Sequence, residues 1–93
     1  MLISYDEDKR RQTLEHRGLD FDHADQVFAG ICLDHIDSRR DYGEVRYQTI
    51  GTLSGVVVMV VWTARGDGRR IISMRKCHDE EKRNYQRELD RSG

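Results

Sequence analysis

An apolar run, VVVMVVWT at Val56–Thr63, constrains the fold more than any other stretch of the chain. Its first seven residues are apolar without a break, and valine, tryptophan and threonine favour strands. Gly55 precedes the run and a turn at Arg65–Gly68 follows it, as expected for a strand that is buried on both faces. The run is too short to cross a bilayer, which takes roughly 20 residues. We therefore predict that it is the central strand of a small sheet.

The Arg65–Gly68 turn leads directly into a second strand-like stretch, Arg69–Lys76, which we predict to be the hairpin partner of the central strand. Side chains alternate between the two faces of a strand. We expect Ile72 and Met74 to meet the core. Regular alternation then gives one face with Arg69, Ile71, Ser73 and Arg75, and an opposite face with Arg70, Ile72, Met74 and Lys76.

The rest of the chain predicts a mixture of helices and strands. Asp6 is placed to begin a helix that ends near His16, with Gly18 as its C-terminal cap, because acidic residues suit a helix N-terminus and glycine suits the cap. The other expected elements are an edge strand at 1–5, a helix from Asp20 to Gly30, strands at 31–35 and 44–50, a polar loop at 36–43, and a third helix after Cys77. The fold class is α+β: two N-terminal helices, a small antiparallel meander and a C-terminal helix.

Composition points to a single domain over residues 1–93. Cys32 and Cys77 fit no metal or redox spacing, so we interpret them as free thiols of a reducing cytoplasm. The N-terminal stretch MLISYDEDKRR lacks the apolar segment of a signal peptide. We therefore expect a cytoplasmic protein that does not associate with membranes.

The net charge of −1 hides an asymmetry between the two halves of the chain. Residues 1–44 hold 6 Lys/Arg against 11 Asp/Glu, whereas residues 45–93 hold 10 against 6. Thirteen of the 16 basic residues are arginine, whose planar fork matches phosphate geometry. This pattern favours a local site for an anionic ligand over a wholly basic nucleic-acid coat. The alternative is that the arginines pair with the acidic half across the fold.

Cationic side chains come from several of the predicted strands. Arg46 lies on the strand before the central one, Arg65 ends the central strand, and Arg70 and Lys76 lie at the two ends of the strand after it. A cluster of this kind can hold a phosphodiester and stabilise charge that develops on it. The alternative is a solvated hairpin end.

Glu81 and Tyr85 lie one turn apart on the third predicted helix. A carboxylate or a phenol beside arginines can act as a general acid or base. The simpler interpretations are that Glu81 complements the helix dipole and that Tyr85 is the packed residue of a polar helix. His16 ends a basic helix, where it also complements a dipole, and the histidines show no metal-ligand spacing. We expect no cofactor.

Several stretches, taken in order, resemble the BrnT-type toxins of bacterial type II toxin–antitoxin modules. The matching stretches are Tyr5–Lys9, Glu15–Phe21, Ala24–Phe28, Gly43–Tyr47 with Ile50–Gly51, Trp62–Gly66, Arg70–Lys76, and Glu81–Arg83 with Tyr85. The resemblance covers roughly residues 4–86, and it is the ordered set, not any single motif, that makes it specific.

The resemblance implies a RelE-like fold and a metal-independent endoribonuclease that inhibits translation. It implies a cognate, DNA-binding, BrnA-like antitoxin, in a heterotetramer of two toxins and two antitoxins that contacts DNA only through the antitoxin. By motif position, phosphate binding and charge stabilisation fall to Arg46, Arg65, Arg75 and Lys76, with Arg70 or its neighbour Arg69 beside them. His16 is a further RNA-binding candidate, and Glu81 and Tyr85 are the candidates for proton transfer.

Two departures from the family pattern bear on these expectations. His78 stands where the family often has the serine or threonine of a capping box, so the helix is expected to start at Asp79, and the pose of Glu81 is open. The chain is also not basic overall. Both departures motivate an alternative, a toxin-fold protein that binds a partner without catalysis. Direct binding to double-stranded DNA has the least support, since no helix carries a recognition-helix pattern.

Overall fold

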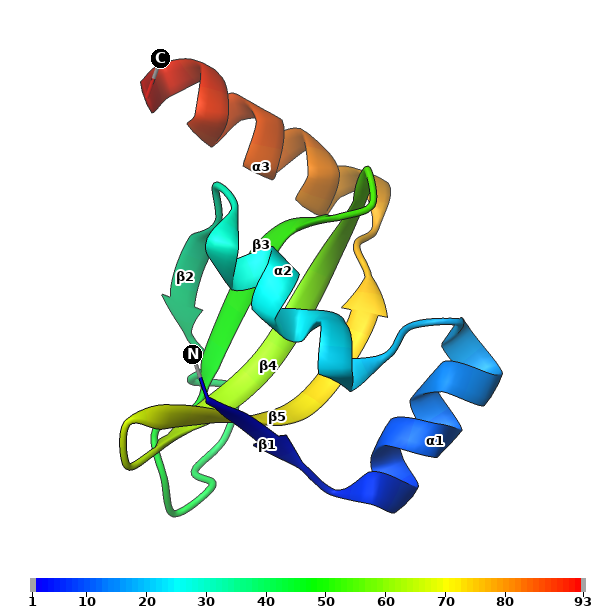
Figure 1. Ribbon diagram of the computed structural model, residues 1–93. Coiled ribbons are helices and arrows are strands. Elements are labelled where there is room, and N and C mark those ends of the chain that lie inside the picture. The colour runs from blue at the N-terminus through cyan, green and yellow to red at the C-terminus, as the bar shows by residue number, and fades with distance from the viewer. Residues whose placement is uncertain (1, 93) are drawn as a thin grey trace.

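The computed structural model describes residues 2–92 and consists of one mixed sheet with helices around it (Figure 1). Met1, at the start of the predicted edge strand, lies outside the described residues. In chain order the elements are β1 (Ile3–Tyr5), α1 (Glu7–Arg17), the short 3-10 helix η1 (Phe21–His23), α2 (Ala24–Ala29), β2 (Leu33–Ile36), β3 (Tyr47–Leu53), β4 (Val56–Arg65), β5 (Gly68–Lys76) and α3 (Asp79–Ser92).

The sheet has the strand order β1-β5-β4-β3-β2. The four strands β2 to β5 form the predicted antiparallel meander, with β4 between its two longest neighbours. The prediction of a purely antiparallel sheet is wrong, because β1 pairs with β5 in parallel, Ile3 opposite Arg69. Only strands joined by short turns must be antiparallel. Between β1 and β5 the chain forms three helices and three other strands, so this pair can be parallel.

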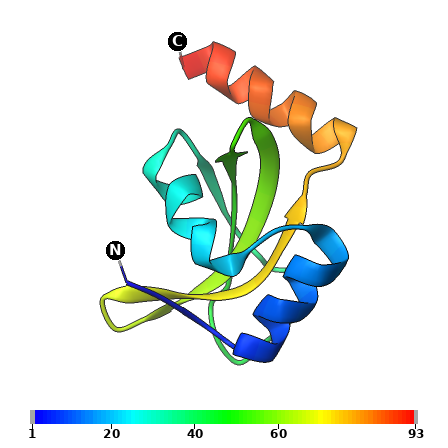
Figure 2. The same cartoon turned by 45° about the vertical axis from the view of Figure 1, so that its right-hand side comes forward.

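The two sheet faces are covered differently (Figures 1 and 2). η1 and α2 lie over what we call the front face, where Phe21, Ala24 and Val27 pack against Val58, Val60 and other buried residues of the sheet. The opposite side, the back face, carries a smaller cluster of Ile50, Met59, Cys77 and Tyr85, through which α3 docks. Val58 to Thr63 are all buried, which confirms the central strand buried on both faces.

The helix ends follow the sequence closely. Asp6 accepts hydrogen bonds from the backbone N–H groups of Asp8 and Lys9, and Gly18 closes α1 with a left-handed φ of 69°. α1 buries none of its residues, as expected for a solvated helix. Asp20 caps η1, which precedes α2, and Gly30 ends α2. α3 begins at Asp79, as expected because His78 stands in place of a capping serine or threonine.

A β-bulge changes which residues of β5 share a face. The register with β4 shifts between Val61, opposite Ser73, and Trp62, opposite Ile71. The extra residue resets the alternation, so Ile71 and Met74 both reach the front core, whereas Ile72 does not. The prediction of a core face with Ile72 was therefore wrong. Arg70 and Arg75, predicted on opposite faces, both lie on the back face, opposite Thr63 and Met59.

Candidate functional site

Three arginines from three parts of the sheet line one pocket of about 160 Å³ on the back face. Arg46 precedes β3, Arg65 ends β4, and Arg70 lies near the start of β5. Thr63 forms part of the pocket wall, and Asp6 and Lys9 at the start of α1 complete it on one side. The structure thus brings together three of the four cations that the sequence predicted for a shared region on these strands, and Lys76 is not among them.

One carboxylate holds two of these arginines. Glu44 accepts hydrogen bonds from Arg46 and Arg65, each at 3.2 Å. Both contacts lower the pKa of Glu44 below its usual value, so the carboxylate is ionised. Arg46 also lies over the ring of Tyr42, 4.0 Å from its centroid. Among residues 2–92 no carboxylate forms an ion pair with Arg70, whose charge is left to attract an anion.

Arg75 makes a bidentate ion pair with Glu81 across the end of the sheet. The two guanidinium nitrogens lie 2.9 Å and 2.8 Å from the two carboxylate oxygens. Glu81 also accepts a hydrogen bond from the backbone N–H of His78 at 2.7 Å, which is half of a capping box. The hydrogen bond from Arg75 lowers the pKa of Glu81 to about 2. Glu81 is therefore ionised at neutral pH and cannot donate a proton there.

Tyr85 lies on the side of α3 that faces the sheet, with only 4% of its surface exposed. Its hydroxyl donates a hydrogen bond of 2.7 Å to the carbonyl oxygen of Ile31, and burial raises its pKa. The side chain belongs to the small back-face cluster with Ile50 and Met59. This position is that of an anchor for α3, away from the three-arginine pocket.

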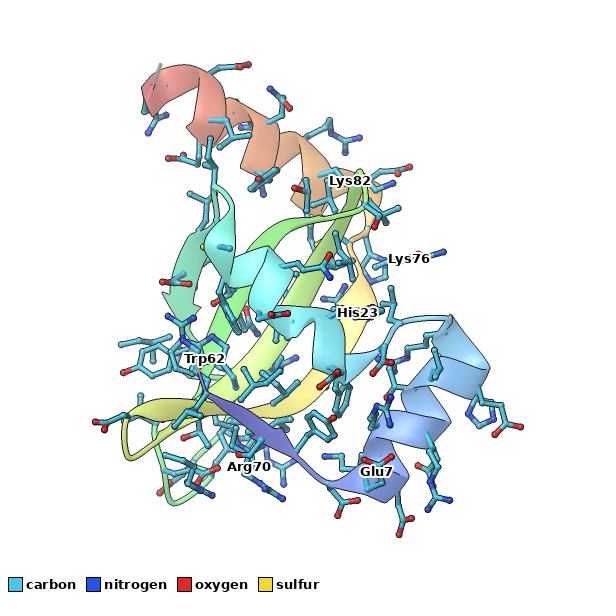
Figure 3. All side chains as sticks on the ribbon, in the orientation of Figure 1. Glu7, His23, Trp62, Arg70, Lys76 and Lys82 are labelled. Carbon is cyan, nitrogen blue, oxygen red and sulfur yellow. The ribbon has the colours of Figure 1, made fainter. Side chains whose placement is uncertain are left out.

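The remaining predicted site residues lie elsewhere. Lys76 shares a hollow with Leu53 and Val56 and, as Figure 3 shows, lies at the opposite end of β5 from Arg70. Arg69 lies on the front face, 4.0 Å from the ring centroid of Phe28 and 4.5 Å from that of Trp62. His16 lies on α1, where its Nδ1 is 2.9 Å from the carbonyl oxygen of Gln12.

Sequence reasoning missed a polar network in the loop between β2 and β3. Asp37 is buried and accepts two side-chain hydrogen bonds of 2.8 Å from Arg39. Tyr42 donates to the same carboxylate at 3.2 Å. The Arg39 hydrogen bonds hold the pKa of Asp37 down to about 2. The detectable signal was the alternation of the strand at 31–35, which continues to Asp37 and turns this residue toward the sheet.

The geometry defines a small α+β protein with a cluster of arginines on one face of its sheet. No group of three or more His, Cys, Asp or Glu residues suited to a metal ion occurs in the part of the chain that the structure describes. Across those same residues no helix is both long and apolar enough to cross a membrane.

Comparison with known protein families places this chain in a class. A family model described as "Ribonuclease toxin, BrnT, of type II toxin-antitoxin system" matches residues 5–81, a span that contains every arginine of the back-face sites. No curated protein matches the chain. The class is that of type II ribonuclease toxins. Within it, the chain belongs to the BrnT family, as the resemblance predicted, and the class implies an antitoxin partner.

Proposed function

We propose that residues 1–93 act as one RelE-like toxin domain, a metal-independent endoribonuclease that binds RNA on the back face of its sheet. The observation that supports this most is the pocket formed by Arg46, Arg65 and Arg70, three cations from separate parts of the sheet that converge beside Thr63. Guanidinium groups bind phosphate oxygens through pairs of charge-assisted hydrogen bonds. Membership of a ribonuclease toxin family supplies RNA as the substrate class.

The proposed reaction is attack of a ribose 2′-oxygen on the adjacent phosphorus. The O2′–P bond forms and the P–O5′ bond breaks, which leaves a 2′,3′-cyclic phosphate and a 5′-hydroxyl. One proton leaves the 2′-hydroxyl for a base, and one is delivered to the 5′-oxygen. The arginines stabilise the negative charge that develops on the phosphoryl oxygens.

Two features of the site bear on the roles of the proton-transfer candidates. Glu81 is ionised, so it can serve only as a base, and its low pKa makes it a weak one. Tyr85 has its hydroxyl proton committed to Ile31. We therefore assign the larger part of catalysis to charge stabilisation by the arginines, and we assign Glu81 also the role of orienting Arg75.

The partners follow from the family. We propose neutralisation by a BrnA-like antitoxin that binds DNA, in a complex of two toxins and two antitoxins, with DNA contacted through the antitoxin alone. The free toxin acts in the cytoplasm, where cleavage of RNA stops translation.

The test compares two variants of the same strand. Arg70→Gln removes a pocket cation that has no ion pair among residues 2–92, whereas Lys76→Gln removes a cation at the far end of β5 on the other face. Wild type and Lys76→Gln are expected to arrest growth of a bacterial host and to create new RNA 5′ ends that carry hydroxyls, and Arg70→Gln to do neither. Purified protein should cleave RNA in excess EDTA. Equal toxicity of Arg70→Gln would contradict the pocket assignment.

A second candidate is a non-catalytic, toxin-fold partner that only binds. It is favoured by the engagement of both proton-transfer candidates, Glu81 with Arg75 and Tyr85 with Ile31. Its signature is a well-folded, soluble wild type that binds RNA or antitoxin without growth arrest and without new RNA ends.

A further inference from the structure

The back-face cations fall into two groups, and the row of residues between them contains no lysine or arginine. Residues that pair across the sheet give this row as His35, Gln48, Val61 and Ser73, each opposite the next. On one side lies the pocket with Arg70, and on the other lies Arg75. Along β5 these two arginines are five residues apart, roughly 16 Å for an extended strand. Neither group alone forms a continuous cationic path across the face.

The loop after β2 brings a further arginine, Arg39, to the back face. The backbone N–H of Asp37 donates to the carbonyl oxygen of Arg46 at 2.8 Å, which continues the pairing of β2 with β3 by one residue. Alternation from His35 then puts the Asp37 side chain on the back face. That side chain is fully buried, while the Arg39 side chain that it holds is 65% exposed. The guanidinium of Arg39 is thus held in place by Asp37 while much of the side chain remains open to solvent.

Contacts link Arg39 to the pocket group, and its charge acts on Arg75. Through Asp37 it contacts Tyr42, whose ring lies under Arg46 of the pocket. On the other side its charge reaches Arg75: Glu81 raises the pKa of Arg75, whereas the positive charge of Arg39 lowers it. The strand register places Asp37, which holds Arg39, and Arg75 on the same face of the sheet.

We propose that Arg39 is a phosphate-binding residue that joins the pocket of Arg46, Arg65 and Arg70 to Arg75 in one continuous track for single-stranded RNA. A groove of this kind follows a nucleic-acid backbone through its successive phosphates. Asp37 positions Arg39 and does not contact the RNA. This inference rests on the proposed function, because it names how that same face holds its substrate.

The test measures salt dependence of binding. A fluorescein-labelled, 12-nucleotide RNA with 2′-O-methyl riboses cannot be cleaved by 2′-attack, so its anisotropy reports binding alone. Arg39→Gln removes the charge but keeps a hydrogen-bond donor for Asp37. Arg11→Gln is the matched control, since Arg11 is exposed on α1 and pairs with Asp8. Arg39→Gln is expected to bind more weakly and to flatten the slope of log K against log salt by about 0.7. Arg11→Gln is expected to keep the wild-type slope.

A second pair of variants keeps the test informative if Arg39→Gln fails to fold. Arg39→Ala with Asp37→Asn removes both charges of the loop pair, and Arg11→Ala with Asp8→Asn removes both charges of the α1 pair, so net charge stays equal. The loop pair is again expected to flatten the slope. A wild-type slope in folded Arg39 variants overturns the track. Absence of salt-dependent binding in the wild type itself overturns RNA binding, and with it the proposed function.

Discussion

At the scale of single residues, the Arg75–Glu81 pair is both a structural contact and part of the proposed RNA face. Each oxygen of Glu81 is bound by Arg75, and one also accepts from the His78 backbone. An RNA phosphate at Arg75 must therefore share the guanidinium with a carboxylate already in place. We expect Glu81 to tune how strongly Arg75 attracts phosphate, while Arg70 forms no ion pair among residues 2–92, so no carboxylate occupies its guanidinium.

The same pair predicts a pH dependence of stability. The folded pKa of Glu81, about 2, lies below its ordinary value of 4.5. A lowered pKa stabilises the fold above pH 4.5, and the stabilisation is lost as pH falls toward 2. Glu81→Gln is expected to lower the free energy of unfolding by about 1–3 kcal/mol at pH 7, with the deficit disappearing near pH 2. Urea titrations of both proteins from pH 7 to pH 2 measure it, and a deficit that is independent of pH contradicts it.

At the scale of elements, α3 is attached to the sheet by few groups, of which Tyr85 is the most buried. Tyr85→Phe keeps the packing and removes only the hydrogen bond to Ile31. We expect a loss of about 1 kcal/mol in the free energy of unfolding and unchanged RNA cleavage. Cleavage assays beside thermal unfolding separate the two effects. A folded Phe variant that no longer cleaves would show that the phenol takes part in the chemistry.

The contact of α2 with β3 depends on a glycine. A Cβ at Gly51 would lie 2.9 Å from a methyl group of Val27 and 3.2 Å from the Cβ of Cys32. Gly51→Ala is therefore expected to cost about 1–3 kcal/mol through overpacking. Gly30→Ala, whose Cβ would have no neighbour nearer than 3.8 Å, is the control and is expected to be tolerated. Chemical denaturation followed by the fluorescence of Trp62 compares them.

Much of this arrangement of elements was predictable, and the exceptions have specific causes. The apolar run at Val56–Thr63 and the cap residues Asp6 and Gly18 act through neighbours in sequence, so local pattern predicted them. The bulge at β5 was not predictable, because one extra residue leaves no mark on composition yet resets every later side chain. The parallel pairing of β1 depends on contacts distant in sequence, whereas the position of Asp37 could have been found by extending the alternation of the strand before it. The sequence therefore grouped Arg70 with Arg46 and Arg65, which share a pocket, but it also grouped Lys76 with them, which lies elsewhere, and it missed Arg39.

At the scale of the whole molecule, the acidic first half and the basic second half of the sequence are not separate regions of the fold. Acidic residues of the first half, Asp37 and Glu44, hold arginines in place on the back face. RNA affinity is therefore expected to follow the back-face cations and not the net charge of −1. With about five phosphate contacts, the slope of log K against log salt should be about −3.5 for single-stranded RNA. Binding titrations at several salt concentrations measure it, and a slope near zero contradicts an electrostatic RNA face.

The parallel pairing of β1 with β5 has a consequence for synthesis. Ile3 pairs with Arg69 and Tyr5 with Ile71, so the sheet cannot close until a ribosome has released most of the chain. Contacts between residues so distant in sequence form late. Arg70, which pairs with Ser4 at this seam, reaches its place only then. Chains cut short before β5 would lack Arg70 and therefore the completed pocket.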